Sequence, residues 1–348
     1  MQKIKLTQFS HGGGCGCKIS PAILQQLLAN IPTGVLPNEL LIGSNTADDA
    51  AVYKLNERQA IIATTDFFTP IVDDPYDFGQ IAATNALSDI YAMGGKPIMA
   101  LAIVGMPLDK LPIEVISQIL AGGASICQKA GIPIAGGHSI DILEPVYGLV
   151  AIGVVDPKKL LSNATAQIGD TLVLTKPLGI GMLSAALKKG LLTDADYDVM
   201  VKLTTTLNMI GSELCNINGV HAMTDVTGFG LAGHLLEMCR GAKLQATINF
   251  AQLPILEPAI NIAKQGIATG ASNRNWQSYG KSIIQVNAAE IWQRNLLTDP
   301  QTSGGLLIAC DGAALSAVND VIKSLQGHEG YVIGRMSKSE PQGAVFVE

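Results

Sequence analysis

Residues 59–105 read QAIIATTDFFTPIVDDPYDFGQIAATNALSDIYAMGGKPIMALAIVG, and this stretch switches twice between strand and helix patterns. Its beginning, 59–65, is apolar and β-branched, and 97–105 is a second strongly apolar run, so both are predicted strands. Between them, 77–93 reads as a helix that ends at two glycines. A strand, a helix and a strand in succession are typical of an α/β or α+β domain.

The alternation continues toward the C-terminus. A helix is predicted over 111–130, a short buried strand over 132–135 and a further strand over 145–155. The polar, small-residue stretch 156–169 then leads into a second domain. Its predicted elements are strands at 171–175, 220–224, 244–250 and 306–310, helices at 182–189 and 231–240, and an exposed loop over 266–280. The predicted division of the chain is a flexible glycine-rich segment at 1–19, an N-terminal domain at 20–156 and a C-terminal domain at 168–348.

The composition of the 348 residues is that of a compact globular protein, with 48% hydrophobic and 15% charged residues. A formal net charge of −6 argues against nucleic-acid binding. Since neither a long apolar run nor a secretion signal is apparent, we expect no membrane contact and a cytoplasmic location. Four cysteines stand alone in apolar or helical segments and are expected to be buried free thiols: Cys127, Cys215, Cys239 and Cys310.

Residues 11–18, His-Gly-Gly-Gly-Cys-Gly-Cys-Lys, combine backbone freedom with reactive groups. Four glycines in eight positions are not expected to hold a stable helix or strand, but they let a chain wrap around a ligand or close like a lid. The segment carries the thiols of Cys15 and Cys17 and the ammonium of Lys18, whose charge favours a thiolate and suits phosphate binding. We interpret it as a mobile reactive segment.

Three other interpretations of this segment stay open on its own residues. It could be half of a zinc site, although no second Cys or His pair lies at short spacing. It could hold a disulfide, although cysteines two positions apart are strained partners. It could also be an unstructured chain end without a function.

The predicted helix over 77–93 carries Ile81, Asn85 and Asp89 four residues apart, and therefore on one face. Apolar neighbours flank Asp89, which disfavours a carboxylate that faces solvent. The face is predicted to present polar groups to a functional site.

Acidic residues stand beside small residues or glycines at several predicted element ends, namely Asp48, Asp49, Asp66, Asp89 and Asp225. Carboxylates gathered in one pocket repel one another unless cations lie among them, and Mg²⁺ prefers carboxylate and phosphate oxygens. The stretches 136–139, 227–230 and 302–305 are candidate anion cradles, because a turn or helix start can direct N–H groups toward phosphate. The sequence contains neither a P-loop nor the Gly-x-Gly-x-x-Gly fingerprint of dinucleotide-binding proteins. We therefore predict that a metal and a nucleotide are bound by a different backbone arrangement.

Together these motifs resemble the selenophosphate synthetase (selenide, water dikinase) family over practically the whole chain. The similarity is carried by 11–18, 48–53, 64–68, 83–89, 136–140, 224–230 and 299–305. The acidic motifs are shared with a wider superfamily that includes aminoimidazole ribonucleotide synthetase, thiamine monophosphate kinase and a hydrogenase maturation factor. The glycine segment with its Cys and Lys narrows the resemblance to the selenium enzymes.

The resemblance implies an α/β (α+β) protein with the two-domain aminoimidazole ribonucleotide synthetase-like (PurM-like) fold. Its N-terminal domain would pair with its twin in a homodimer to form a dimeric β-barrel, beside a C-terminal α+β domain. The implied reaction converts ATP, hydrogen selenide and water to selenophosphate, AMP and orthophosphate, with Mg²⁺ and usually a potassium ion. The product would supply selenium for selenocysteine and selenium-modified tRNA, and a selenium-delivery protein is a candidate partner.

The site residues implied by the resemblance form three groups. Cys15 and Lys18 match the catalytic residues. Asp49, Asp89 and Asp225 match the magnesium ligands. The nucleotide contacts match Lys18, Thr46, Ala47, Asp48, Asp66, Asp89, Gly137, His138 and Ser139.

Two other functions are alternatives. A related ATP-dependent kinase or synthetase acting on a small molecule such as thiamine monophosphate would need neither Cys15 nor Lys18, so it would survive loss of residues 1–18. A nucleotide-responsive selenium or thiol carrier would bind ATP without consuming it.

Overall fold

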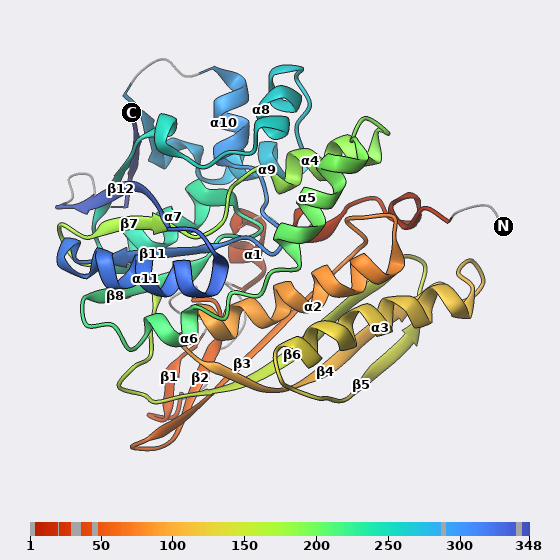
Figure 1. The fold of residues 1–348 in the computed structure, drawn as a ribbon, viewed down its shortest axis with the longest axis horizontal. Helices are drawn as coiled ribbons and strands as arrows, with labels where there is room; N and C mark the ends of the chain where they lie inside the picture. Colours follow the sequence, from red (N-terminus) through yellow and green to blue (C-terminus); the bar gives the residue numbers. More distant parts are fainter. Residues whose placement is uncertain (1–3, 20, 29–35, 44–47, 287–289, 339–342) are drawn as a thin grey trace.

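The computed structural model describes residues 4–19, 21–28, 36–43, 48–286, 290–338 and 343–348. Two sheets with their helices pack against each other, and the long helix α2 lies between them (Figure 1). The predicted strand, helix and strand of 59–105 are confirmed as β3, α2 and β4.

The N-terminal sheet has the strand order β1-β2-β3-β6-β4-β5. Its strands are β1 (Leu40–Ile42), β2 (Ala51–Asn56), β3 (Gln59–Phe68), β4 (Lys96–Met106), β5 (Ile134–Asp141) and β6 (Val146–Val155). The helices α2 (Pro75–Ala92) and α3 (Ile113–Lys129) run side by side along this sheet (Figure 1). The short helix α1 (Pro21–Leu28) precedes the sheet.

The C-terminal sheet has the order β10-β13-β9-β12-β7-β11-β8. Its strands are β7 (Thr171–Leu174), β8 (Val220–Asp225), β9 (Gln245–Ile248), β10 (Ile283–Gln285), β11 (Leu306–Cys310), β12 (Tyr331–Ser337) and β13 (Val345–Val347). The helices of this half are α4 (Ile180–Lys188), α5 (Asp194–Thr204), α6 (Gly211–Leu214), α7 (Gly230–Ala242), α8 (Glu257–Lys264), α9 (Gly270–Tyr279), α10 (Ile291–Leu297) and α11 (Leu315–Gln326).

Helix α2 contacts both halves of the protein and is buried along most of its length. Its start is capped by Asp74, whose carboxylate accepts a hydrogen bond from the backbone N–H of Asp77 at 3.0 Å, and Pro75 fits the first turn. On one side it packs on α3, β3 and β6, and on the other it contacts β8, α5 and α6. The polar residues of α2 therefore lie at the junction of the domains.

The expectation of an exposed loop over 266–280 is wrong, because α9 occupies most of it. Thr269 caps this helix, its Oγ1 accepting a hydrogen bond from the backbone N–H of Ser272 at 3.0 Å. Ser272 and Asn275 are buried and donate hydrogen bonds to backbone carbonyls, including that of Gly228. Composition predicted solvent exposure here, but these side chains are polar because they hold neighbouring loops.

Two predicted element ends are also wrong. Asp66 lies inside β3, which runs on to Phe68, and not at the end of a strand. The stretch 136–139, predicted to be a turn or helix start, lies within β5 at the free edge of the sheet and is exposed. The glycines allowed the chain to continue as an extended strand with positive φ at Gly136 and Gly137.

All six cysteines are free thiols. Cys127, Cys239 and Cys310 are buried as predicted, whereas Cys215 is partly exposed. No helix in the described ranges combines the length and hydrophobicity that crossing a membrane requires. The cytoplasmic location stays a prediction.

Candidate active site

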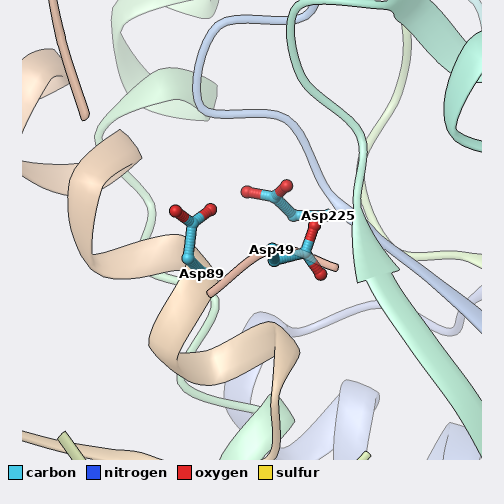
Figure 2. A group of neighbouring side chains, drawn as sticks. All are labelled: Asp49, Asp89 and Asp225. Atoms are coloured by element: carbon cyan, nitrogen blue, oxygen red, sulfur yellow. The ribbon is translucent and has the colours of Figure 1, made fainter. Parts of the chain in front are cut away.

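Three carboxylates from distant parts of the chain point toward one another at the domain junction (Figure 2). Asp49 lies just before β2, Asp89 is on α2 and Asp225 ends β8. One ligand oxygen of each lies within 4.8 Å of the others. Hydroxyl groups orient two of them: Thr224 Oγ1 donates to Asp49 Oδ1 at 2.8 Å, and Thr64 Oγ1 donates to Asp89 Oδ2 at 2.5 Å.

The cluster is electrostatically strained without a cation. Burial, followed by the neighbouring carboxylates, raises the pKa of Asp49 and of Asp89 well above its usual value, and burial raises that of Asp225. One oxygen each of Asp49 and Asp225 is buried without a hydrogen-bond partner in the described part of the chain. Unpaired oxygens of this kind suit a hard divalent cation such as Mg²⁺.

The glycine segment is docked against both domains, and its centre is η2 (Gly14–Cys17), one turn of 3₁₀ helix. The expectation that the segment holds no helix is therefore wrong for this turn. The N–H of Gly14 donates to Thr69 O at 2.9 Å, and the N–H of Cys15 donates to Thr302 Oγ1 at 2.9 Å. A Cβ at Gly14 would lie 2.4 Å from Thr302 Oγ1, and its φ is +54°, so this close approach requires glycine.

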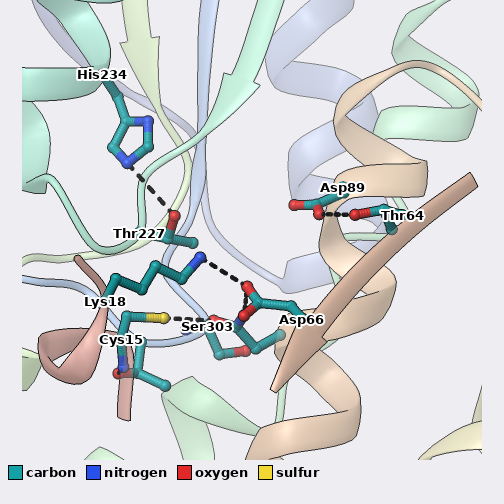
Figure 3. Close-up of polar contacts among 10 residues, drawn as sticks. Cys15, Lys18, Thr64, Asp66, Asp89, Thr227, His234 and Ser303 are labelled. Carbon is teal, nitrogen blue, oxygen red and sulfur yellow. Dashed lines mark hydrogen bonds and ion pairs between the residues drawn. The ribbon is translucent and has the colours of Figure 1, made fainter. Parts of the chain in front are cut away.

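Cys15 and Lys18 lie beside Asp66 (Figure 3), and Asn85 links the thiol of Cys15 to that carboxylate. The thiol of Cys15 donates to Asn85 Oδ1 at 3.2 Å, and Asn85 Nδ2 donates to Asp66 Oδ2 at 2.6 Å. The same Asp66 oxygen pairs with Lys18 Nζ at 2.8 Å. Burial lowers the pKa of Lys18, but Asp66, Cys15 and Asp89 raise it more, so Lys18 stays charged.

Cys15 is 1% exposed, and burial raises the pKa of its thiol far above the usual range, although Lys18 lowers it. Lys18 therefore favours the thiolate, as expected from the sequence, but burial outweighs its effect in this docked state. Desolvation outweighs one neighbouring positive charge because that charge is already paired with Asp66.

A cavity of about 610 Å³ opens on the outer side of the docked segment. Cys17 lines it together with Lys18, Lys188 and Arg274. Two of these side chains hold the segment by its backbone: Arg274 Nη2 donates to Gly16 O at 2.7 Å, and Lys188 Nζ donates to Ser10 O at 3.0 Å. The two thiols therefore differ, with Cys17 facing the cavity and Cys15 facing the interior.

We expect iodoacetamide to alkylate Cys17 faster than Cys15 in the free protein, by about tenfold or more, because Cys15 is buried and protonated. Arg274→Gln removes the hydrogen bond to Gly16 and should accelerate the reaction of Cys15. Peptide mass spectrometry over time measures both rates. Equal rates for the two thiols would contradict the docked arrangement.

The remaining predicted nucleotide contacts lie apart from one another. Asp48 Oδ1 accepts hydrogen bonds from Ser162 Oγ at 2.8 Å and from the N–H of Asn163 at 2.9 Å. Gly137, His138 and Ser139 line a separate cavity of about 360 Å³ beside α3. Thr46 and Ala47 lie outside the described residues. The nucleotide roles of all of these residues stay predictions.

Sequence reasoning did not single out several residues that build the site. Thr302 belongs to a stretch predicted only as an anion cradle, and Arg274 and Lys188 gave no signal of their own.

Lys176 is another residue that sequence reasoning missed. It is buried, and burial lowers its pKa to about 7. Its Nζ donates to Thr206 O at 2.6 Å and to Ser303 O at 3.0 Å. A lysine directly before Pro177 after a predicted strand carried no pattern that could have revealed this role.

The fold and site define a class of protein. Residues 47–155 match the family model of the AIR synthase related protein, N-terminal domain, and residues 167–346 match that of the C-terminal domain. A thiamine-monophosphate kinase from Stenotrophomonas maltophilia has a similar structure, with a TM-score of 0.65 and 19% identity over 89% of this chain and 92% of its own. The hydrogenase maturation protein HypE in complex with ATP is also similar, with a TM-score of 0.66 and 18% identity. The match covers 99% of this chain and 94% of HypE. The two-domain aminoimidazole ribonucleotide synthetase-like fold is thereby confirmed.

Sequence similarity is far closer to one group within that class. The chain is 60% identical to selenide, water dikinase of Pseudomonas straminea, over 99% of this chain and 96% of the relative. It is 59% identical to selenide, water dikinase of Paraburkholderia xenovorans, over 97% of this chain and 95% of the relative. The chain belongs to the selenide, water dikinase family.

Proposed function

We propose that this enzyme converts ATP, hydrogen selenide and water to selenophosphate, AMP and orthophosphate. One observation carries the proposal: Asn85 and Asp66 join the thiol of Cys15 and the ammonium of Lys18 into one network at the domain junction, where Asp49, Asp89 and Asp225 also meet. A phosphotransferase of the thiamine monophosphate kinase kind has no need of that thiol, so the docked Cys15 favours the selenium chemistry.

Each part of the site has a role in this reaction. Asp49, Asp89 and Asp225 would hold Mg²⁺, which neutralises charge on phosphate oxygens when bound. Lys18 stays charged and would attract both the selenide anion and the ATP phosphates. Cys15 would hold or deliver selenium. The glycine segment would cover the site and exclude water, which protects an activated phosphoryl group from hydrolysis.

Anaerobic turnover followed by phosphorus NMR tests this function. We expect AMP and a species with a phosphorus–selenium bond to form only when ATP, Mg²⁺ and selenide are all present. ATP consumption to ADP that is indifferent to selenide would favour the kinase alternative, and tight ATP binding without turnover would favour a carrier. A requirement for potassium and a selenium-delivery protein as partner stay predictions. The use of the product as selenium donor for selenocysteine and selenium-modified tRNA also stays a prediction.

We further propose that the protein is a homodimer through its N-terminal sheet. β5 is an edge strand, and large apolar side chains of the sheet are exposed, including Tyr53 at 42%, Phe67 at 48% and Ile140 at 53%. Exposed apolar side chains together with a free edge favour pairing with a second copy. Gly137–Ser139 lie on that edge strand, so their predicted nucleotide contacts would form at the subunit interface.

Ile140→Asp is expected to shift the protein from dimer to monomer, because a carboxylate would be buried against the second sheet. Light scattering coupled to size-exclusion chromatography measures the mass. Ile168→Asp is the matched control, since Ile168 is 64% exposed but lies just before β7, in the C-terminal domain. A variant at Ile140 with the same mass as the parent would argue against this interface.

A further inference from the structure

Ser303 has a backbone conformation and a hydroxyl group that the fold alone does not explain. Its φ is +54°, and among the described residues Lys243 is the other non-glycine residue with positive φ. Ser303 is 1% exposed, and its Oγ is buried without a hydrogen-bond partner in the described part of the chain. Left-handed backbone and an unpaired buried hydroxyl each cost free energy, so together they indicate a functional position.

The backbone of Ser303 is held from two sides. Lys176 Nζ donates to its carbonyl oxygen at 3.0 Å, and its N–H donates to Asn85 Oδ1 at 2.7 Å. The next carbonyl, that of Gly304, accepts a hydrogen bond from Asn208 Nδ2 at 2.9 Å. Three buried side chains thus fix the turn, and the strained conformation persists because of them.

This turn lies between the thiol and the carboxylate cluster. On one side, Asn85 Oδ1 accepts hydrogen bonds from both Cys15 Sγ and the N–H of Ser303, so the sulfur and Ser303 share one acceptor atom. Figure 3 shows Cys15 and Ser303 side by side. On the other side, Asn208 Nδ2 also donates to Ser88 Oγ at 2.8 Å, and Ser88 lies close enough to Asp225 to lower the pKa of its carboxyl.

Deprotonation of Cys15 would leave its sulfur in an unsuitable environment. A thiol can donate to Asn85 Oδ1, but a thiolate cannot, and an amide oxygen beside an anion is repulsive. The same holds for a selenide anion placed at the sulfur. The hydroxyl of Thr302 and the charge of Lys18 already favour the anionic sulfur. The hydroxyl of Ser303 is a further buried donor without a partner in the described part of the chain, on the residue whose N–H shares the acceptor atom with the sulfur.

We propose that Ser303 is a further catalytic residue, whose hydroxyl donates a hydrogen bond to the anionic chalcogen at this site, either the Cys15 thiolate or the selenide beside it. This inference builds on the proposed function. The expected contribution is that of one directed hydrogen bond to a reacting anion.

Ser303→Ala and Ser303→Gly test the proposal as a pair. Both remove the hydroxyl, but glycine also relieves the positive φ, so an effect shared by both variants belongs to the hydroxyl. We expect kcat/KM for selenide to fall about 100-fold in both variants. The Kd for MgATP should stay within about twofold, because the proposal assigns the hydroxyl to the chalcogen and not to the nucleotide phosphates or the metal.

A second readout does not depend on turnover. The rate at which iodoacetamide alkylates Cys15, from neutral to alkaline pH, is measured by peptide mass spectrometry in the parent protein and in each variant. Because the thiolate is the reacting form, this rate reports the thiolate fraction even where that fraction is small. Lys18, Asp66 and Cys17 are the charged or titratable groups that face Cys15, and they are unchanged in both variants. A contact with sulfur predicts about tenfold less thiolate at a given pH in the variants, equivalent to one pH unit.

The outcomes show whether the hydroxyl contacts the sulfur of Cys15 or the selenide, and they test the role of Ser303 separately from the proposed function. Less thiolate in the variants assigns the contact to sulfur, and a higher KM for selenide with unchanged thiolate assigns it to selenium. Unchanged values in both readouts, weaker MgATP binding, or full activity in Ser303→Gly alone would overturn the role of the hydroxyl. Absence of selenide turnover in the parent protein would instead refute the proposed function, and the thiolate readout would then decide the role of Ser303.

Discussion

Cys15→Ser is expected to lower selenide-dependent turnover by about 10³-fold or more while leaving the Kd for MgATP within about twofold. A serine hydroxyl fits the same place and can still donate to Asn85 Oδ1, so the docked segment should survive. Its far higher pKa and harder oxygen cannot take over the chemistry of a chalcogen nucleophile. Anaerobic AMP formation measures turnover, and calorimetric titration with MgATP measures binding.

Cys17→Ser is the matched control for this prediction. It makes the same chemical change two residues away, in a side chain that faces the outer cavity. We expect activity within about twofold of the parent protein. Full activity in Cys15→Ser, or an equal loss in both variants, would refute the role assigned to Cys15.

Asp49→Asn should weaken binding of MgATP by about 100-fold and yet stabilise the metal-free protein, by on the order of 1 kcal/mol. The asparagine keeps an oxygen that can accept the hydrogen bond from Thr224, but it removes one of three mutually repelling carboxylates. Denaturant unfolding in a chelator measures stability, and titration with MgATP measures binding.

The stability difference should depend on pH in a defined direction. A carboxyl whose pKa is raised in the folded protein keeps its proton where the unfolded chain has lost it, so the folded state is penalised increasingly as pH rises toward the folded pKa. The gain in Asp49→Asn should therefore be larger at neutral pH than near pH 5, and saturating Mg²⁺ should reverse its sign.

Asp311→Asn provides the control for Asp49→Asn. Asp311 is an exposed carboxylate that caps a short turn in the C-terminal domain. We expect neither MgATP binding nor the pH dependence of stability to change beyond the loss of that cap. Equal stability of Asp49→Asn and the parent at every pH in chelator would contradict the repulsion argued for the cluster.

The sequence by itself determined the elements that carry the site. Apolar and β-branched runs predicted β3 and β4, and the spacing of four between Asn85 and Asp89 placed both on one face of α2. Local periodicity suffices there because these elements are long and buried, so local preference and tertiary packing agree. The seven motifs that carry the resemblance were enough to predict the family, with residues 11–18 narrowing it to the selenium enzymes.

Only the tertiary structure decided how those elements meet. No local pattern reveals that Thr302 accepts from the N–H of Cys15, or that Lys176 holds the carbonyl of Ser303, because the partners lie far apart in the chain. The polar sequence of α9 predicted a loop because its buried hydrogen bonds form only in the folded chain. The neighbouring Lys18 does favour a thiolate at Cys15, but the sequence could not show that burial outweighs this effect. Desolvation depends on everything packed around a group, and that is fixed by the fold and not by adjacent residues.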